Sequence, residues 1–249
     1  MALFVDGPIA SAEDLRRYES SILDVMSVEK IELGAKLDIA HRELAVELTA
    51  FLVRQETLTG SNRDLGHVVV TEALSQWHAL HTLSLIYRDA YNSQLNDRYQ
   101  GKWQEYSRLS RASSSRFFEI GVGLSRSPLP RAARPLVMTV PGSAVAPGTY
   151  YCRVAWCGDM GEIGGLSDLA EVAVGAGEVF AVEPGVAPPH ARTWAVFAGT
   201  DPEDLVLQEL VSVGSAWLPA EALEVATSAS VMQQQPDHYV TSRRNLFRG

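Results

Sequence analysis

Cysteine and long apolar runs are scarce in this sequence of 249 residues. Its two cysteines, Cys152 and Cys157, are five residues apart in a strand-like stretch and should point to opposite faces, so we expect two free thiols. No apolar run approaches the roughly eighteen residues that a membrane-spanning helix needs. The N-terminal stretch "MALFVDGPIASAEDLRR" has no basic region and predicts no secretory signal. We therefore expect a protein of a reducing compartment without a membrane segment.

Basic residues are scarce in the second half of the chain. The formal net charge is -9, and residues 1–134 carry 16 Lys or Arg and 17 Asp or Glu, whereas residues 135–249 carry 5 and 13. A protein that binds duplex DNA regardless of its sequence needs a broad positive surface. The sequence therefore argues against nucleic acid as a high-affinity ligand.

Catalytic and cofactor motifs are missing as well. The sequence contains no G-x-S-x-G elbow, no H-E-x-x-H, no P-loop and no dinucleotide-binding glycine fingerprint. The Gly-rich stretch 158–165 has no Lys and does not precede a helical pattern, so it reads as a hairpin loop. His78 and His81 form the one pair with metal-like spacing and lack a convincing third ligand. The sequence predicts no catalytic residue, no cofactor and no metal site.

Helical periodicity dominates the first half. After a capping signal at Ser11, apolar residues recur every three or four positions as far as Met26, which predicts one helix. A second helix is expected from about Val28 to Gln55, followed by a loop over 56–67. A third begins near Thr71 and either continues to Leu109 or restarts near 92–96. We interpret residues 1–110 as an α-helical domain.

An aromatic row runs along this third helix. Its members recur mostly at four-residue intervals: Tyr87, Tyr91, Leu95, Tyr99, Trp103 and Tyr106. Because a helix turns roughly 100° per residue, each four-residue step drifts by about 40° and the row wraps around the helix. Either the row packs inside its own bundle on two sides, or part of it contacts another subunit. The candidate subunit interface consists of Tyr91, Arg98, Tyr99, Trp103 and Tyr106.

Residues 111–134 lose this periodicity and are rich in Arg, Ser and Pro, which predicts a linker. From 108 to 134 the chain has six arginines against a single acidic residue, Glu119. One interpretation is a solvated connector. The other is an arm on an acidic surface of a neighbouring chain, which the apolar Phe117, Phe118 and Ile120 favour.

The second half changes to a period of two. Tyr150, Cys152, Val154 and Trp156 alternate with polar positions, and turn signals separate several further short strands. We expect an antiparallel β-sandwich of the immunoglobulin or fibronectin-III type over residues 135–228. The fold class is therefore α+β in separate domains.

The last stretch, residues 229–249, shows neither the helical nor the strand periodicity, and its final residues are rich in arginine. This composition predicts an extended arm that folds onto a partner. The residues expected to make this contact are Tyr239, Arg243, Arg244, Leu246, Phe247 and Arg248.

These features together resemble a known family. The stretch "LSQWHALHTLSLIYRDAYNSQLNDRYQGKWQEYSRLS" resembles the long helices of head-tail connector (adaptor) proteins of tailed bacteriophages, and "ARTWAVFAGTDPEDLVLQ" resembles sandwich domains of virion proteins. The first likeness covers roughly residues 10–115 and rests on pattern, so it carries over no individual functional residues.

The resemblance implies a structural protein and not an enzyme. Such adaptors form a ring, typically of twelve copies, in the neck of a virion that was assembled in the host cytoplasm. The ring binds the portal protein and a downstream tail or neck protein around the DNA channel, and the arm is expected to contact the portal. Two alternatives remain open: another neck or tail component, or a glycan- or host-surface-binding sandwich that acts through loops such as 157–166.

Overall fold

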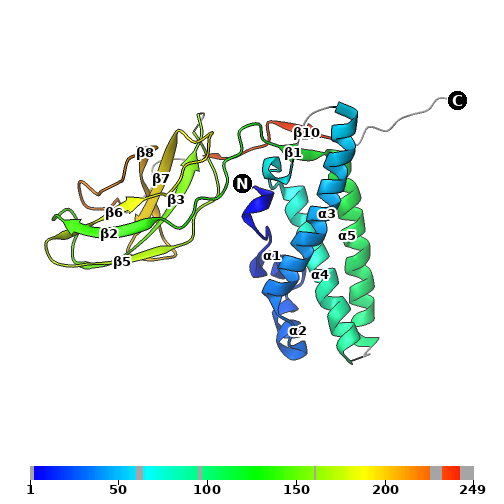
Figure 1. Ribbon diagram of the computed structural model, residues 1–249. Coiled ribbons are helices and arrows are strands. Elements are labelled where there is room, and N and C mark those ends of the chain that lie inside the picture. Colours follow the sequence, from blue (N-terminus) through cyan, green and yellow to red (C-terminus); the bar gives the residue numbers. More distant parts are fainter. Residues whose placement is uncertain (1–2, 60–63, 95–96, 160, 225–231, 242–249) are drawn as a thin grey trace. The chain divides into compact units, whose positions relative to one another are not determined.

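Two compact units make up the protein, and each combines segments that are distant in sequence (Figure 1). The helical unit comprises Gly7–Arg126 and Pro236–Gly249, and the β unit comprises Met1–Asp6 and Ser127–Gln235. The chain therefore passes between the units three times, which corrects the expectation of consecutive domains. The computed structural model describes residues 3–59, 64–94, 97–159, 161–224 and 232–241.

Helices form the first half, as the periodicity predicts. Within the described residues the helical unit contains α1 (Ala12–Tyr18), α2 (Ile22–Glu29), α3 (Leu33–Thr59), α4 (Glu72–Gln94) and α5 (Gln100–Ile120). Short 3-10 turns, η2 (Leu65–His67) and η3 (Asp97–Tyr99), precede α4 and α5. Figure 1 shows α3, α4 and α5 side by side as the long elements of this unit. In the described part of the chain, no helix is sufficiently long and apolar to cross a bilayer.

The first predicted helix is two helices. Ser11 and Asp14 form a reciprocal capping box that starts α1, as the sequence indicates. The chain leaves helical geometry at Glu19, which has an extended backbone, and α2 then ends at Lys30 in the left-handed region. The break lets Leu15 of α1 and Ile22 of α2 both reach the same core.

The predicted linker is wrong in its first half, because α5 continues to Ile120. Phe117 and Phe118 fix these last turns: their rings lie 5.5 Å from the Trp77 ring of α4, and the Phe118 ring lies 5.0 Å from that of Phe51 in α3. Two of the three apolar residues that favoured an arm on a neighbouring chain, Phe117 and Phe118, therefore pack within their own unit, whereas Ile120 is 51% exposed. The helix ends at Gly121, whose positive φ of 109° suits glycine.

The segment after α5 pairs with the C-terminal part of the chain. β1 (Val122–Leu124) is antiparallel to β10 (His238–Val240). Asp237 accepts hydrogen bonds from the Arg126 backbone N–H at 2.6 Å and from the Ser125 hydroxyl at 3.3 Å. A Cβ on Gly123 would lie 2.8 Å from the Pro236 ring, so this close approach requires glycine. Residues 236–241 are therefore part of the helical unit and not a free arm.

Antiparallel pairing dominates the β unit, whose strands are β2 (Leu136–Pro141), β3 (Gly148–Cys157), β4 (Glu162–Ile163), β5 (Ala170–Val174), β6 (Glu178–Glu183), β7 (Thr193–Gly199), β8 (Val206–Ser212) and β9 (Met232–Gln233). One sheet has the order β8-β7-β3-β4-β9, with β5 also paired to β3, and the other consists of β2 and β6. Only the short β4–β9 pairing is parallel among the described strands. Both sheets contribute to one core, in which Trp156 and Trp194 from the first sheet and Phe180 from the second are buried.

Segments outside the predicted boundaries complete the β unit. Leu129 is buried in its core, and the Leu129 backbone N–H donates to the Gln234 side chain at 3.2 Å. The Arg131 backbone N–H donates to Asp6 at 2.8 Å, while the Arg131 guanidinium reaches Asp168 at 2.6 Å. Residues 127–134 are therefore structured parts of the unit, and the range 135–228 is too narrow.

The two cysteines are free, as predicted, and face different clusters. Cys152 lies in the core between the sheets, and Cys157 packs on the opposite side with Ala155 and Ile163. Burial raises the pKa of Cys152 to about 12 and that of Cys157 to about 11. Both thiols are therefore protonated and unreactive in the native state at neutral pH.

Histidines join the three long helices. His81 of α4 reaches Glu43 of α3 at 2.5 Å and Ser110 of α5 at 3.2 Å. His78 is 0% exposed, and its Nε2 lies 3.2 Å from the Leu37 carbonyl. Burial, with a smaller contribution from the nearby His41 and His81, lowers the pKa of His78 to about 4. The predicted metal-like pair thus contributes to helix packing.

This burial makes the helical unit sensitive to acid. The folded-state pKa of His78 lies below the unfolded value of 6.5, so the unfolded chain binds the proton first as the pH falls. Stability is therefore fully present above about pH 6.5, and we expect a loss of about 3 kcal/mol on going from pH 6.5 to pH 4. Urea unfolding followed by circular dichroism at 222 nm measures this loss.

The matched variants are His78→Gln, which keeps a donor for Leu37 and does not titrate, and His190→Gln at an exposed position of the β unit. His78→Gln should flatten the pH dependence in this window, and His190→Gln should not. An unchanged pH profile in His78→Gln would contradict the assignment.

Candidate functional site

Two residues of the predicted subunit interface are buried in the core of the helical unit. Tyr99 and Tyr106 are each only 4% exposed. The Tyr106 ring stacks on the Tyr87 ring with centroids 5.5 Å apart, and the Tyr99 ring lies 6.1 Å from Tyr87. Since these rings fill the space between α4 and α5, Tyr99 and Tyr106 are not available to another subunit.

A polar contact at Glu19 holds the edge of this aromatic cluster. The Tyr106 hydroxyl lies 3.1 Å from the Glu19 carboxylate, and the Lys102 ammonium lies 2.7 Å from it. Burial alone raises the pKa of Glu19, but hydrogen bonds from Lys102, Ser21 and Tyr106 outweigh it and lower the pKa. Burial and this same carboxylate raise the pKa of the Tyr106 hydroxyl. The cluster is thus a satisfied structural network.

Three members of the predicted interface do reach the surface. Tyr91 and Trp103 are half-buried and stack on each other with centroids 5.6 Å apart. Arg98 is exposed, and its guanidinium lies 5.3 Å above the Tyr99 ring. This accessible end of the row retains the Tyr, Trp and Arg composition that is enriched at protein interfaces.

A second apolar feature lies on the outer face of α3. Ile39, Val46 and Val53 recur every seven residues and are 37%, 70% and 53% exposed. We call these three residues the α3 stripe. The inward face of the same helix, with Leu44 and Leu48, is buried. A seven-residue repeat of β-branched residues is typical of a helix that packs along another helix.

Sequence reasoning missed this stripe because the inward repeat on α3 is stronger. The polar residues Arg42, Glu43 and Glu47 lie between its members and suggest a solvated face. The signal that could have revealed it is a second apolar repeat in the same helix, at seven-residue spacing, in addition to the inward repeat.

The predicted arm is only partly described. Tyr239 lies in β10 and is 51% exposed, which suits a contact with a partner. The remaining residues of this prediction lie outside the described residues: Arg243, Arg244, Leu246, Phe247 and Arg248.

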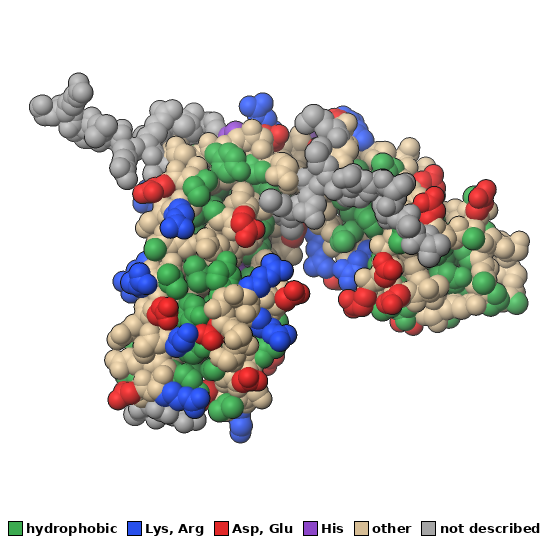
Figure 2. Space-filling model, turned by 180° about the vertical axis from the view of Figure 1, so that it is seen from behind, with side chains coloured by type: hydrophobic (Ala, Val, Ile, Leu, Met, Phe, Trp, Pro, Cys, Tyr) green, Lys and Arg blue, Asp and Glu red, His purple; other side chains and the backbone are tan. Residues whose placement is uncertain are grey.

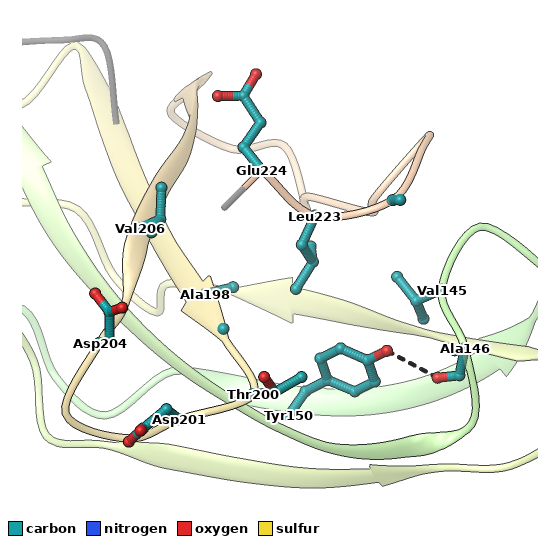
Figure 3. Close-up of a pocket in the computed structure, with 12 residues that line it drawn as sticks. Val145, Ala146, Tyr150, Ala198, Thr200, Asp201, Asp204, Val206, Leu223 and Glu224 are labelled. Carbon is teal, nitrogen blue, oxygen red and sulfur yellow. Dashed lines mark hydrogen bonds between the residues drawn. The ribbon is translucent and has the colours of Figure 1, made fainter. Parts of the chain in front are cut away.

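A pocket of about 320 Å³ opens in the β unit (Figure 3). The β2–β3 connection, the end of β7 with the turn that follows it, and a segment after β8 form its walls. Figure 3 shows the Tyr150 ring on its floor with Leu223 pointing toward the ring. The Tyr150 hydroxyl donates to the Ala146 carbonyl at 2.8 Å, so the ring presents carbon to the pocket.

Side-chain hydrogen bonds fix the walls of this pocket. The Gln208 amide donates to the Glu224 carbonyl at 3.1 Å and accepts from the Glu224 backbone N–H at 2.9 Å. A Cβ on Gly199 would lie 2.8 Å from the Asp204 carbonyl, so the turn after β7 requires glycine. Asp201, Asp204 and Glu224 also line the pocket and are exposed, and Figure 3 shows the Glu224 carboxylate pointing outward, away from the Tyr150 ring. These apolar and acidic residues together suit a small chemical group that has an apolar body and a positive charge, such as the side chain of a larger ligand.

No protein-family model and no curated protein matches this sequence.

The aromatic row yields a stability prediction. Because Tyr106 is buried in a stacked pair, Tyr106→Ala should destabilise the helical unit by about 3–5 kcal/mol. Arg98→Ala, at the exposed end of the same row, removes the contact of the guanidinium with the Tyr99 ring and should destabilise the unit by no more than about 1 kcal/mol. Urea unfolding at pH 7.5 followed by circular dichroism measures both changes. A Tyr106→Ala variant as stable as the wild type would show that this ring does not belong to the core.

Proposed function

We propose that this chain is a structural virion protein: a head-to-tail adaptor that forms a ring on the portal of a tailed bacteriophage and joins capsid to tail around the DNA channel. The observation that carries the proposal is the α3 stripe. The helical unit already has a closed aromatic and aliphatic core, and it still exposes regularly spaced Ile39, Val46 and Val53. Apolar residues at seven-residue spacing along one side of a helix are the pattern of a helix that packs lengthwise on another helix.

The dimensions of the stripe suit a lateral contact between subunits. From Ile39 to Val53 the helix rises about 21 Å, which gives a partner helix four turns to pack against. In a ring, a stripe on one subunit meets a different face of the next subunit, and the contact closes at a fixed rotation. The exposed edge of Tyr91 and Trp103 supplies further aromatic area for such a contact.

The β unit is proposed to be an immunoglobulin- or fibronectin-III-like sandwich. Its pairing supports this: β2 pairs with β6, while β5, β3, β7 and β8 are neighbours in the other sheet. These pairings match strands B–E and C′–C–F–G of such folds. The pocket then lies where the B–C and F–G loops meet, an end of the fold that commonly carries binding loops.

A binding module that attaches to a glycan or a host surface is the second candidate. The pocket beside Tyr150 favours it, and this pocket is formed by residues other than the predicted loop 157–166. A glycan array probed with the full chain addresses this candidate. Binding that is lost on a Leu223→Arg substitution would support it.

Disrupting the stripe tests the adaptor proposal. The full chain is mixed with the portal protein of the same virus, and rings are counted by negative-stain electron microscopy. Val46→Glu places a charge in the centre of the stripe and should reduce ring formation at least tenfold, because a charge inside an apolar contact is costly. The side chain is 70% exposed in the free subunit, so helicity should be unchanged.

Val186→Glu is the matched control, since Val186 is 95% exposed in the β unit. It should form rings as the wild type does. Wild-type rings from Val46→Glu would exclude the stripe as the subunit contact.

A further inference from the structure

The net charge of the protein is confined to the β unit. This unit has four Arg and no Lys against 13 Asp or Glu, which gives -9, whereas the helical unit has 17 of each sign. Figure 2 shows acidic side chains gathered on the visible face of the β unit and mixed charges on the helical unit. A cationic partner is therefore attracted to the β unit in particular.

The carboxylates beside the pocket have no internal counter-charge. Arg131 pairs with Asp168 at 2.6 Å and Arg192 pairs with Asp159 at 2.8 Å. Within the described residues, no Lys or Arg forms an ion pair with Asp201, Asp204 or Glu224. The parts of the β unit outside the described ranges contain no basic residue. The other two arginines of the unit, Arg134 and Arg153, make no ion pair with these carboxylates in the described structure, so a cation that pairs with them has to come from outside the unit.

The pocket itself selects for a cation with an apolar body. Its wall residues Val145, Ala198, Val206 and Leu223 are apolar, and the Tyr150 ring forms its floor. An arginine or lysine side chain can lay its aliphatic stem on such a surface while its charged head faces the carboxylates. A volume of about 320 Å³ is at the small end of ligand pockets, which suits side chains of a peptide.

We propose that this pocket binds the C-terminal segment 242–249 of a neighbouring copy of the chain. The segment reads "SRRNLFRG" and combines Arg243, Arg244 and Arg248 with Leu246 and Phe247, without an acidic residue. It therefore supplies both the missing positive charge and apolar side chains for the floor. This charge complementarity favours the β unit over the portal, to which the sequence alone assigned the segment. The inference goes beyond the proposed adaptor function and does not depend on it.

Peptide binding tests the pocket. A fluorescent peptide of residues 241–249 is titrated by anisotropy into the full chain that carries Arg243→Gln, Arg244→Gln and Arg248→Gln, so that its own segment does not compete. We expect saturable binding that weakens as salt is raised. Asp204→Asn with Glu224→Gln, which removes two charges at the pocket edge, should weaken it at least tenfold.

The matched control is Glu171→Gln with Glu183→Gln, which removes the same charge at exposed positions lining no part of the pocket. This control should weaken binding less than twofold. Equal affinity for this Arg-substituted chain with and without Asp204→Asn and Glu224→Gln would overturn the proposal. So would an equally large loss in the control, because the attraction would then be general to the acidic unit.

Crosslinking tests whether the segment comes from another copy. A photo-crosslinking residue replaces Leu246 in the full chain, and light and ¹⁵N-labelled chains are mixed in equal amounts above the measured dissociation constant. Crosslinked peptides that join position 246 to pocket residues should include mixed-isotope pairs. Same-isotope pairs alone would overturn the assignment to a neighbouring copy. Neither measurement needs a portal, so failure here is distinguishable from failure of the adaptor proposal.

Discussion

The pairing of β1 with β10 is the constraint on which the organisation of the chain depends. It joins residues that are more than one hundred positions apart, and it is possible because Gly123 leaves room for the Pro236 ring. Asp237 then accepts the Arg126 backbone N–H and so fixes the chain where it re-enters the helical unit. Because the chain crosses between the units three times, the β unit is completed by the N-terminal segment and the helical unit by the C-terminal segment.

This closure determines which surfaces remain for partners. Tyr87, Tyr99 and Tyr106 are buried in the core, where the Tyr87 ring contacts the other two rings, while Tyr91 and Trp103 remain half-buried. The α3 stripe and the acidic end of the β unit are left outside. The α3 stripe lies on the helical unit and the net negative charge lies on the β unit, so each unit offers a chemically distinct contact.

Local periodicity predicted most helices and strands, but it failed where the buried face of a helix consists partly of small polar residues. On α5 the buried positions include Ser110 and Ser113, which allow a close approach to α4 and carry no apolar signal. The stretch therefore resembled a linker, although Phe117 and Phe118 marked it as packed. The unit membership of the first six residues and of 236–241 depends on long-range pairing, which no local pattern encodes.

The pocket shows why a site of this kind could be foreseen only in part. The sequence revealed that the second half of the chain is acidic, but not which carboxylates lack a counter-charge. That property requires knowing that Arg131 and Arg192 are engaged elsewhere and that Gln208 holds Glu224 beside the turn after β7. The excess of acidic residues can be counted from the sequence. A binding site, however, requires that some of these carboxylates lack a basic partner and also lie next to the apolar floor of the pocket. Folding creates this condition by bringing together three loops that are distant along the chain.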